Sequence, residues 1–267
     1  EVYAEPRFFI KEMEMDNRAI GFFDSGLGGL TSVPVLKRTL PNEKVLYFGD
    51  TARTPYGSKS PDTVCKFSAQ IVDYLVSKNV KLIVIACNTV TAMALDMLRE
   101  KHPEVPIVGV IDPTARRVAA DGVCNVGIIG TKVTIESGVY AESIHSLNPN
   151  INTYSLACPA FVPLIEEGII DNEIMDLTIK YYMDDFVKNN NIDSLILGCT
   201  HYPLIAANIK RIYPELKLYN SSAEVISDVV DILTEKDMLA GENDFPDRFY
   251  ASDLSENFIR MTDTLFE

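Results

Sequence analysis

The sequence predicts an α/β protein made of two similar halves, and three observations lead to this fold class. Short apolar runs alternate with segments of helical length along most of the 267 residues. Most runs lack the in–out alternation of a half-solvated strand, as expected for mainly parallel sheets that are covered on both faces. Three runs in the first half also have counterparts, in the same order, in the second half. Such a pattern is typical of an α/β architecture.

Each expected strand is a short apolar run that ends near small or polar residues. The runs are 19–24, 44–50, 81–88, 106–111, 125–130, 151–158, 194–199 and 217–220. Between them, segment 60–78 begins with Ser60 as a helix cap and with Pro61 at the first helical position. Segments 171–189 and 222–236 follow a similar helical pattern.

The composition narrows the class of function. The 38 acidic residues outnumber the 24 Lys and Arg residues, and the resulting net charge of −14 argues against binding to a nucleic acid. The longest mostly apolar stretch, 82–98, is too short and too polar to span a bilayer. No secretory leader is recognisable, and residues 1–17 match no structural pattern, so they are interpreted as an N-terminal extension or a cloning remnant. We expect a cytoplasmic protein that binds a small molecule and no membrane.

The five cysteines are widely spaced and include no CxxC pair, so neither disulfides nor a zinc site is expected. Cys158 precedes a proline and is interpreted as a packing residue. Cys87 and Cys199 differ, because each ends the third strand of its half, 63 residues after Asp24 and 69 residues after Gly130. Open parallel sheets carry their chemistry at these carboxyl ends. The pattern therefore favours catalysis over packing for this pair.

Polar residues accompany both thiols. The string Ala-Cys-Asn-Thr places Asn88 and Thr89 after the first thiol, and Gly-Cys-Thr-His-Tyr-Pro places Thr200 and His201 after the second. One buried cysteine at a strand end is usually packing, but a matched pair followed by amide and hydroxyl groups is typical of a site. The remaining ligands of a Cys/His metal set are not evident.

The string Phe-Asp-Ser-Gly-Leu-Gly-Gly-Leu forms a tight turn that contains Asp24 and Ser25. It lacks the Lys of a phosphate-binding loop, and Thr31 stands where a dinucleotide fingerprint needs its third glycine. Either Asp24 and Ser25 line a site, or the turn is structural with Asp24 as a cap. The loop with Tyr56 and Gly57 is equally a site loop or a solvated surface loop.

Two thiols that form no disulfide can invert a stereocentre, because one removes a proton from carbon while the other delivers one to the opposite face. A cleft between two pseudo-twofold-related domains supplies this geometry. An ordinary cysteine is only about 3% ionised at neutral pH, so its neighbours must adjust it. We expect Asp24 beside Cys87, and Glu166 with His201 beside Cys199, although Glu166 alone is more often a solvated helix charge. Hydroxyls that suit an anionic transition state are those of Ser25, Thr89, Thr131 and Thr200.

As a set, these strings resemble a known family. The motifs Asp-Ser-Gly-Leu-Gly-Gly, Gly-Asp-Thr-Ala-Arg-x-Pro-Tyr-Gly, Ala-Cys-Asn-Thr and Gly-Cys-Thr-His-Tyr-Pro are similar to those of glutamate racemases, from about Arg18 to the C-terminus. The resemblance implies interconversion of L- and D-glutamate for peptidoglycan synthesis, without a cofactor or a metal. Three alternatives stay open: a racemase or isomerase of another acidic substrate (aspartate, a hydantoin or maleate), a single-cysteine amidase, and a non-catalytic amino-acid-binding module.

The resemblance also implies roles for residues, domains and assembly. Cys199 acts on L-glutamate with support from Glu166 and His201, and Cys87 acts on the D enantiomer with support from Asp24. The implied domains are 18–110 plus 222–267 and 111–221, and a homodimer is implied. Residues implied to contact the substrate, or to lie in the polar environment around it, are Asp24, Ser25, Asp50, Tyr56, Gly57, Asn88, Thr89, Thr200 and His201.

Overall fold

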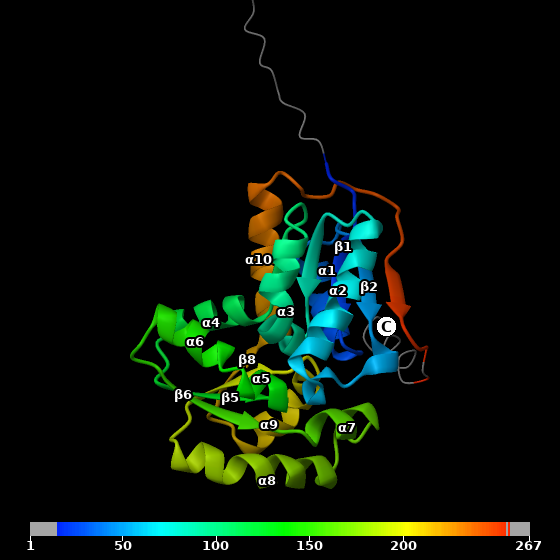
Figure 1. Cartoon of the computed structure of the whole chain (residues 1–267). Coiled ribbons are helices and arrows are strands. Elements are labelled where there is room, and N and C mark those ends of the chain that lie inside the picture. Colours follow the sequence, from blue (N-terminus) through cyan, green and yellow to red (C-terminus); the bar gives the residue numbers. More distant parts are fainter. Residues whose placement is uncertain (1–14, 255, 257–267) are drawn as a thin grey trace, which may run out of the picture.

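The computed structural model describes residues 15–254 and residue 256, and these form two stacked lobes (Figure 1). Each lobe is built around its own sheet, and the strand pairs of both sheets are parallel. Within the described residues, the upper lobe of Figure 1 holds a five-stranded sheet in the order β4-β3-β1-β2-β9. The lower lobe holds a four-stranded sheet in the order β6-β5-β7-β8. The predicted α/β fold with two mainly parallel sheets is therefore confirmed.

The strands are short, and most of their residues are buried. The upper sheet contains β1 (Ile20–Asp24), β2 (Val45–Gly49), β3 (Leu82–Ile85), β4 (Ile107–Gly109) and β9 (Arg248–Ala251). The lower sheet contains β5 (Asn125–Gly130), β6 (Asn152–Ala157), β7 (Ser194–Gly198) and β8 (Lys217–Asn220).

The centres of the two sheets have the same topology. β1 pairs with β2 on one side and with β3 on the other, and β5 pairs in the same way with β6 and β7. Cys87 follows β3 and Cys199 follows β7. The two cysteines therefore occupy equivalent places at the carboxyl ends of equivalent strands, where parallel sheets position functional groups.

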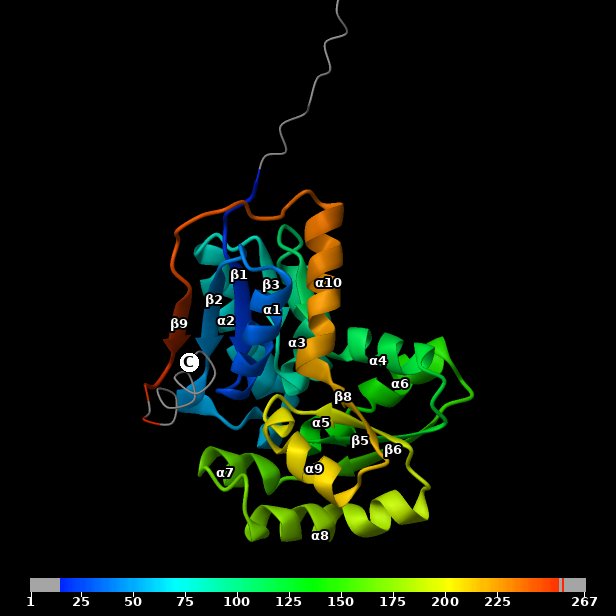
Figure 2. The same ribbon diagram turned by 180° about the vertical axis from the view of Figure 1, so that it is seen from behind.

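Helices cover both faces of each sheet, which explains the continuous apolar strands (Figure 2). On the upper sheet, α1 (Val33–Thr39) and α10 (Ser221–Glu235) pack on one face, and α2 (Pro61–Ser77) and α3 (Asn88–Lys101) pack on the other. On the lower sheet, one face is covered by α4 (Ile111–Ala120) and α6 (Val139–Leu147). The opposite face is covered by α7 (Phe161–Glu166), α8 (Glu173–Asn189) and α9 (Ala206–Ile212), while α5 (Lys132–Glu136) lies next to α3.

The predicted helices 60–78, 171–189 and 222–236 match α2, α8 and α10 to within two residues. The predicted strand 81–88 is too long at its C-terminal end, because β3 ends at Ile85 and Cys87 is the residue that precedes α3. The thiol of Cys87 therefore lies in the turn between strand β3 and helix α3, outside the hydrogen-bonded part of the sheet. Strand β9 was not predicted.

The described residues before β1 pack against the upper lobe. Lys81 lies at the start of β3 and is fully buried, with Nζ 2.7 Å from Glu43 Oε2. The same ammonium donates to the carbonyls of Asp16 and Met238, each at 2.6 Å. Residues 15–17 are thus tied to the core, whereas residues 1–14 of the predicted extension lie outside the described residues.

The chain passes between the lobes twice. It enters the lower lobe between β4 and α4 and returns between β8 and α10, and the helices α4 and α10 that follow these crossings pack together. This path is compatible with the predicted domains, 18–110 plus 222–267 and 111–221, and the division itself stays a prediction. Residues 255 and 257–267 lie outside the described residues.

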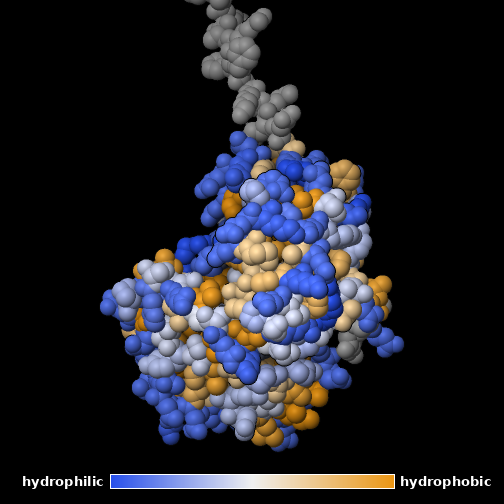
Figure 3. Space-filling model, viewed as in Figure 1, coloured by the Kyte–Doolittle hydropathy of each residue, from blue (hydrophilic) through white to orange (hydrophobic). Residues whose placement is uncertain are grey.

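The outer surface carries both polar and apolar side chains. Figure 3 shows hydrophilic and hydrophobic residues mixed over one face of the two lobes. None of the helices in the described part of the chain combines the length and the apolar character needed to cross a bilayer.

Candidate active site

Cys87 is almost fully buried between β3 and α3, at 5% exposure. Its Sγ lies 3.3 Å from the hydroxyl of Ser25, which follows β1. Burial, together with the neighbouring carboxylate of Asp24, raises the pKa of the Cys87 thiol to about 12. At neutral pH this sulfur is therefore held as a neutral thiol.

Asp24 ends β1 and is fully buried. Its Oδ2 accepts from the backbone N–H of Gly26 at 3.1 Å, and its Oδ1 accepts from the hydroxyl of Thr200 at 3.4 Å. Burial raises the pKa of the Asp24 carboxyl, while His201 and these hydrogen bonds oppose the rise. Gly29 is required here, because a Cβ at that position would lie 2.6 Å from the Asp24 Cβ. The glycine-rich turn thus packs its backbone against the carboxylate.

Cys199 follows β7 and has a different neighbour. Its Sγ lies 3.8 Å from Nδ1 of His201, and Nε2 of the same ring lies 3.1 Å from Oε1 of Glu166. Burial lowers the pKa of His201, but its contacts with Cys199 and Glu166 outweigh burial and raise the pKa to about 10. The imidazole is therefore a cation at neutral pH, and it lies beside the Cys199 sulfur.

Both thiols face one small pocket, which lies where the carboxyl ends of the two sheets meet. Its volume is about 20 Å³, and both lobes contribute to its wall. The predicted contact residues that line it are Ser25, Tyr56, Gly57, Asn88, Thr89, Thr131, Thr200 and His201. The predicted residues Asp24, Asp50 and Glu166 do not line the pocket; they lie behind this wall, where they hydrogen-bond to Thr200, Tyr56 and His201 respectively.

Four lining residues were not predicted as contacts: Thr54, Pro55, Val162 and Gly198. Thr54 and Pro55 belong to the loop that carries Tyr56, so the loop motif was the signal for them. Gly198 precedes Cys199 directly. Val162 lies in α7, and its sequence has no feature that separates it from an ordinary core valine.

Three threonine hydroxyls form a ring beside the pocket and join the lobes. The Oγ1 atoms of Thr89 and Thr131 are 3.0 Å apart, those of Thr89 and Thr134 are 3.1 Å apart, and those of Thr131 and Thr134 are 3.0 Å apart. Gly57 packs directly against Thr131, and a Cβ at Gly57 would collide with its side chain. Thr89 comes from α3, and the other two threonines come from the turn into α5 and from α5 itself.

Tyr56 directs its hydroxyl away from the pocket. The hydroxyl donates to Oδ2 of the buried Asp50, and this same oxygen lies 2.6 Å from Nε of Arg53. The other carboxylate oxygen of Asp50, Oδ1, accepts from Ser252 Oγ at 2.8 Å. Burial and the Asp50 contact raise the pKa of Tyr56 far above its ordinary value. The Asp50 cluster therefore fixes the loop, and the tyrosine ring is what remains to contact a ligand.

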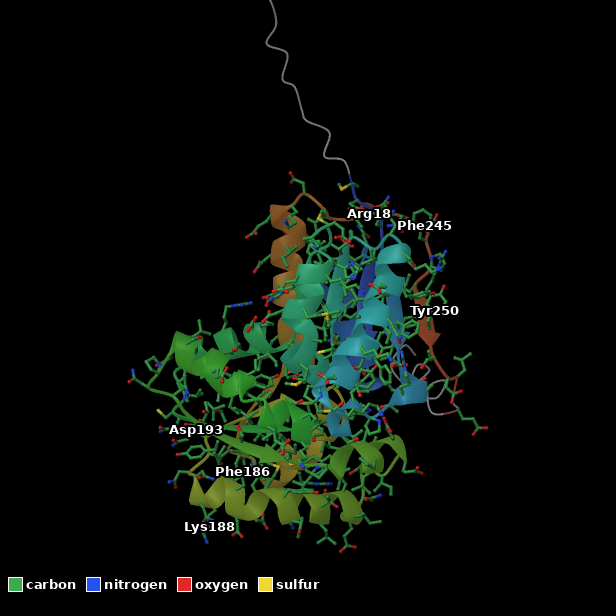
Figure 4. The ribbon with its side chains drawn as sticks, in the orientation of Figure 1. Arg18, Phe186, Lys188, Asp193, Phe245 and Tyr250 are labelled. Atoms are coloured by element: carbon green, nitrogen blue, oxygen red, sulfur yellow. The ribbon has the colours of Figure 1, made fainter. Side chains whose placement is uncertain are left out.

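A larger hollow of about 420 Å³ lies at the other end of the upper lobe, at the amino ends of β1, β2 and β9. Arg18 and Phe245, which are labelled near the top of Figure 4, belong to its lining, together with Lys44 and Arg248. Neither thiol lines this hollow. Within the described residues there is also no cluster of three or more His, Cys, Asp and Glu side chains that could hold a metal ion. Because both thiols line the small pocket and neither lines the larger hollow, the small pocket is the candidate active site.

The chain is similar to known racemases over most of its length. Residues 33–229 match the family model described as Asp/Glu/Hydantoin racemase. A glutamate racemase from Geobacter metallireducens is 45% identical over 249 residues, which cover 91% of each chain. One from Sulfurihydrogenibium is 47% identical over 215 residues, which cover 80% of this chain and 82% of the relative.

Solved structures lead to the same group. The glutamate racemase of Francisella tularensis, described as a complex with D-glutamate, superposes with a TM-score of 0.88 at 42% identity and covers 94% of both chains. That of Escherichia coli superposes with a TM-score of 0.77 at 26% identity, over 93% of this chain and 95% of that chain. An aspartate racemase from Picrophilus torridus, at 18% identity and a TM-score of 0.62, shares the fold.

Proposed function

The chain belongs to the Asp/Glu/hydantoin racemase family, among the glutamate racemases, and we propose that it interconverts L- and D-glutamate by proton transfer between Cys87 and Cys199. The single observation that supports this mechanism is that both thiols line one pocket, from equivalent strand ends of the two lobes. A two-base inversion needs one acid/base group on each face of the reacting carbon. A single-cysteine amidase has no use for the second thiol.

The proposed reaction from L- to D-glutamate starts with Cys199 as thiolate and Cys87 as thiol. The Cys199 thiolate takes the proton from Cα, and the electron pair of the broken C–H bond stays on the substrate, delocalised towards its α-carboxylate. The Cys87 thiol then gives its proton to the opposite face of Cα. The step leaves Cys199 as thiol and Cys87 as thiolate, which is the starting state of the reverse reaction.

The surroundings of the thiols support these charge states. The His201 cation lies beside Cys199, and the raised pKa of Cys87 keeps its proton available for transfer. Hydroxyl and amide groups along the wall, from Ser25 and Asn88, can donate to the carboxylates of a bound amino acid. Because a cavity of about 20 Å³ holds on the order of one water molecule, the pocket must widen before glutamate binds.

We propose that the D-glutamate formed supplies peptidoglycan synthesis, as the family resemblance implies. This role places the enzyme in the cytoplasm, where the amino acid is drawn from metabolism. The homodimer that the resemblance implies stays a prediction, to be checked by sedimentation of the purified chain.

The decisive test incubates the protein with L-glutamate in D₂O and follows both circular dichroism and deuterium at Cα. We expect loss of optical activity together with deuteration, with no added cofactor and no effect of chelators. L-Aspartate, a hydantoin and maleate, run in parallel, test the alternative substrates. A covalent adduct that accumulates on one cysteine, without racemisation, would identify an amidase. Affinity for glutamate without isotope exchange would identify a binding module.

A further inference from the structure

A buried chain of hydrogen bonds runs from the lower lobe through the pocket wall and back. The hydroxyl of Tyr140 in α6 donates to Asn88 Oδ1 at 2.6 Å, and Asn88 Nδ2 donates to Ser221 Oγ at 3.2 Å. The Ser221 hydroxyl then donates to the carbonyl of Leu197 in β7 at 3.1 Å. Asn88, Tyr140 and Ser221 are each no more than 2% exposed. Water therefore cannot replace these bonds cheaply.

The last member of this chain, the Leu197 carbonyl, favours one direction for the bonds that lead to it. A backbone carbonyl only accepts, so the Ser221 hydroxyl must give its proton to Leu197. The serine oxygen is then left to accept from the Asn88 amide nitrogen. The Asn88 oxygen consequently faces Tyr140, whose hydroxyl must donate. In this arrangement the Asn88 amide oxygen faces Tyr140 and its nitrogen faces Ser221, while the Tyr140 hydroxyl is also within hydrogen-bond reach of Ser221 and Thr114.

The geometry points to Tyr140 and Ser221 as positioning residues that hold the Asn88 amide with an N–H aimed into the pocket. Asn88 lines the pocket, and within the described part of the chain only Ser221 accepts from its Nδ2. One of the two amide hydrogens is therefore left for a ligand oxygen. A flipped amide would present its carbonyl oxygen instead and would repel a carboxylate. This inference rests on the proposed function in so far as the ligand is an acidic amino acid.

The same series of hydrogen bonds connects the two backbone segments that carry the thiols. Asn88 directly follows Cys87, and Leu197 lies two residues before Cys199. Ser221 is the first residue of α10, where the chain returns to the upper lobe. The sulfur atoms themselves are not part of these hydrogen bonds. Loss of Tyr140 or Ser221 should therefore raise the KM for the substrate more than it lowers kcat.

The test is a double-mutant cycle between Tyr140→Phe and Asn88→Ala. We expect Tyr140→Phe to raise the KM for both enantiomers about tenfold, the effect of one buried hydrogen bond lost to a group that then lacks its partner, with kcat changed less than about threefold. In the Asn88→Ala background, Tyr140→Phe should cause no further loss. Ser221→Ala should behave like Tyr140→Phe, so the inference stays testable if one variant fails to fold.

Tyr219→Phe is the matched control. Tyr219 is also 2% exposed and lies in the lower lobe, and its hydroxyl donates to Asp121 at 3.1 Å, outside the pocket. It should leave KM and kcat unchanged. An unchanged KM in Tyr140→Phe, or an equal loss in the presence and absence of the Asn88 side chain, would overturn the positioning role.

A spectroscopic readout separates this inference from the proposed function. The side-chain NH₂ signals of Asn88 in a ¹⁵N correlation spectrum are identified by their loss in Asn88→Ala. We expect slow hydrogen exchange of these signals in the parent protein and fast exchange in Tyr140→Phe. If the parent protein does not racemise glutamate, the proposed function fails, yet this experiment still decides whether Tyr140 holds the amide. Equal exchange in both proteins would refute the inference whatever the activity.

Discussion

The two thiol sites occupy equivalent places in similar lobes but have opposite electrostatic surroundings. Burial and the nearby carboxylate of Asp24 raise the pKa of Cys87, whereas Cys199 lies 3.8 Å from the ring of His201, a cation at neutral pH. The repeated fold therefore places the two thiols in equivalent positions, and the different residues beside them give the thiols different electrostatic environments. Such a difference suits a reaction that needs one thiol and one thiolate at the same time.

Thermodynamics limits how a difference between the two thiols can appear in the kinetics. Because enantiomers have equal free energies, the equilibrium constant of racemisation is one, so kcat/KM must be the same in both directions. Differences between the thiols can therefore appear only in kcat and KM taken separately, or in isotope effects.

Removal of either sulfur has the largest expected effect. Cys87→Ala and Cys199→Ala should each lower kcat/KM in both directions by about a thousandfold or more, because each removes an acid/base group. Circular dichroism with L- and with D-glutamate measures the loss. Cys65→Ala is the control, since Cys65 is partly buried in the upper lobe but does not line the pocket. Full activity in either pocket variant would contradict the two-base mechanism.

Removal of the cation beside Cys199 should have the next largest effect. His201→Gln keeps a polar side chain of similar length but loses the positive charge, and we expect kcat/KM to fall about a hundredfold, within the range known for acid/base machinery. The primary deuterium isotope effect should rise more with L-glutamate than with D-glutamate, because proton removal by Cys199 becomes slower. Asp24→Asn, on the other side, should raise the isotope effect more with D-glutamate. Equal changes from both enantiomers in both variants would show that the two sites are not distinguished in this way.

The pH dependence gives a third test. Since the pKa of His201 is raised from 6.5 to about 10, the cation is present at neutral pH, and activity should fall as the pH rises through about 10. Glu166→Gln removes one of the groups that raise this pKa, so the basic limb should move to lower pH by about one unit. The same shift makes His201 stabilise the fold, a contribution fully present below pH 6.5 and lost as the pH rises to about 10. If the basic limb of the pH profile does not move in Glu166→Gln, then Glu166 does not raise the pKa of the group that titrates there.

Tyr56→Phe should have the smallest effect. The Tyr56 hydroxyl binds Asp50 rather than facing the pocket, so we expect kcat/KM to change by only about threefold and stability to fall by about 1 kcal/mol. Thermal unfolding together with the racemisation assay measures both. A fall in kcat/KM comparable with that of His201→Gln would contradict this expectation. It would mean that the loop that carries Tyr56, and not only the residues beside the sulfurs, contributes to the difference between the two thiol sites.

Much of this site could be predicted from short local strings. Asp24, Cys87 and Cys199 each follow a recognisable apolar run, and parallel strands bring their carboxyl ends to one edge. Tyr140 and Ser221 could not be found in this way. They lie on different helices, 52 and 133 residues from Asn88, and only the packing of the two lobes brings them to its amide.

The same limit applies to strand β9. Its four residues lie at the edge of the upper sheet and are only partly buried, and a polar, proline-containing segment precedes them. A short edge strand needs no long apolar run, so periodicity gives no signal for it. Its place is fixed by pairing with β2, about 200 residues earlier in the sequence.

The return of the chain through α10 and β9 has a consequence for biosynthesis. A ribosome delivers the first four strands of the upper sheet by residue 109, then the entire lower lobe, and only afterwards the helix and strand that complete the upper one. While residues 111–220 emerge, the apolar face that later receives α10 is uncovered in the nascent polypeptide. Because the strands of the lower lobe are contiguous in the sequence, we expect that lobe to complete its sheet before α10 and β9 complete the upper one.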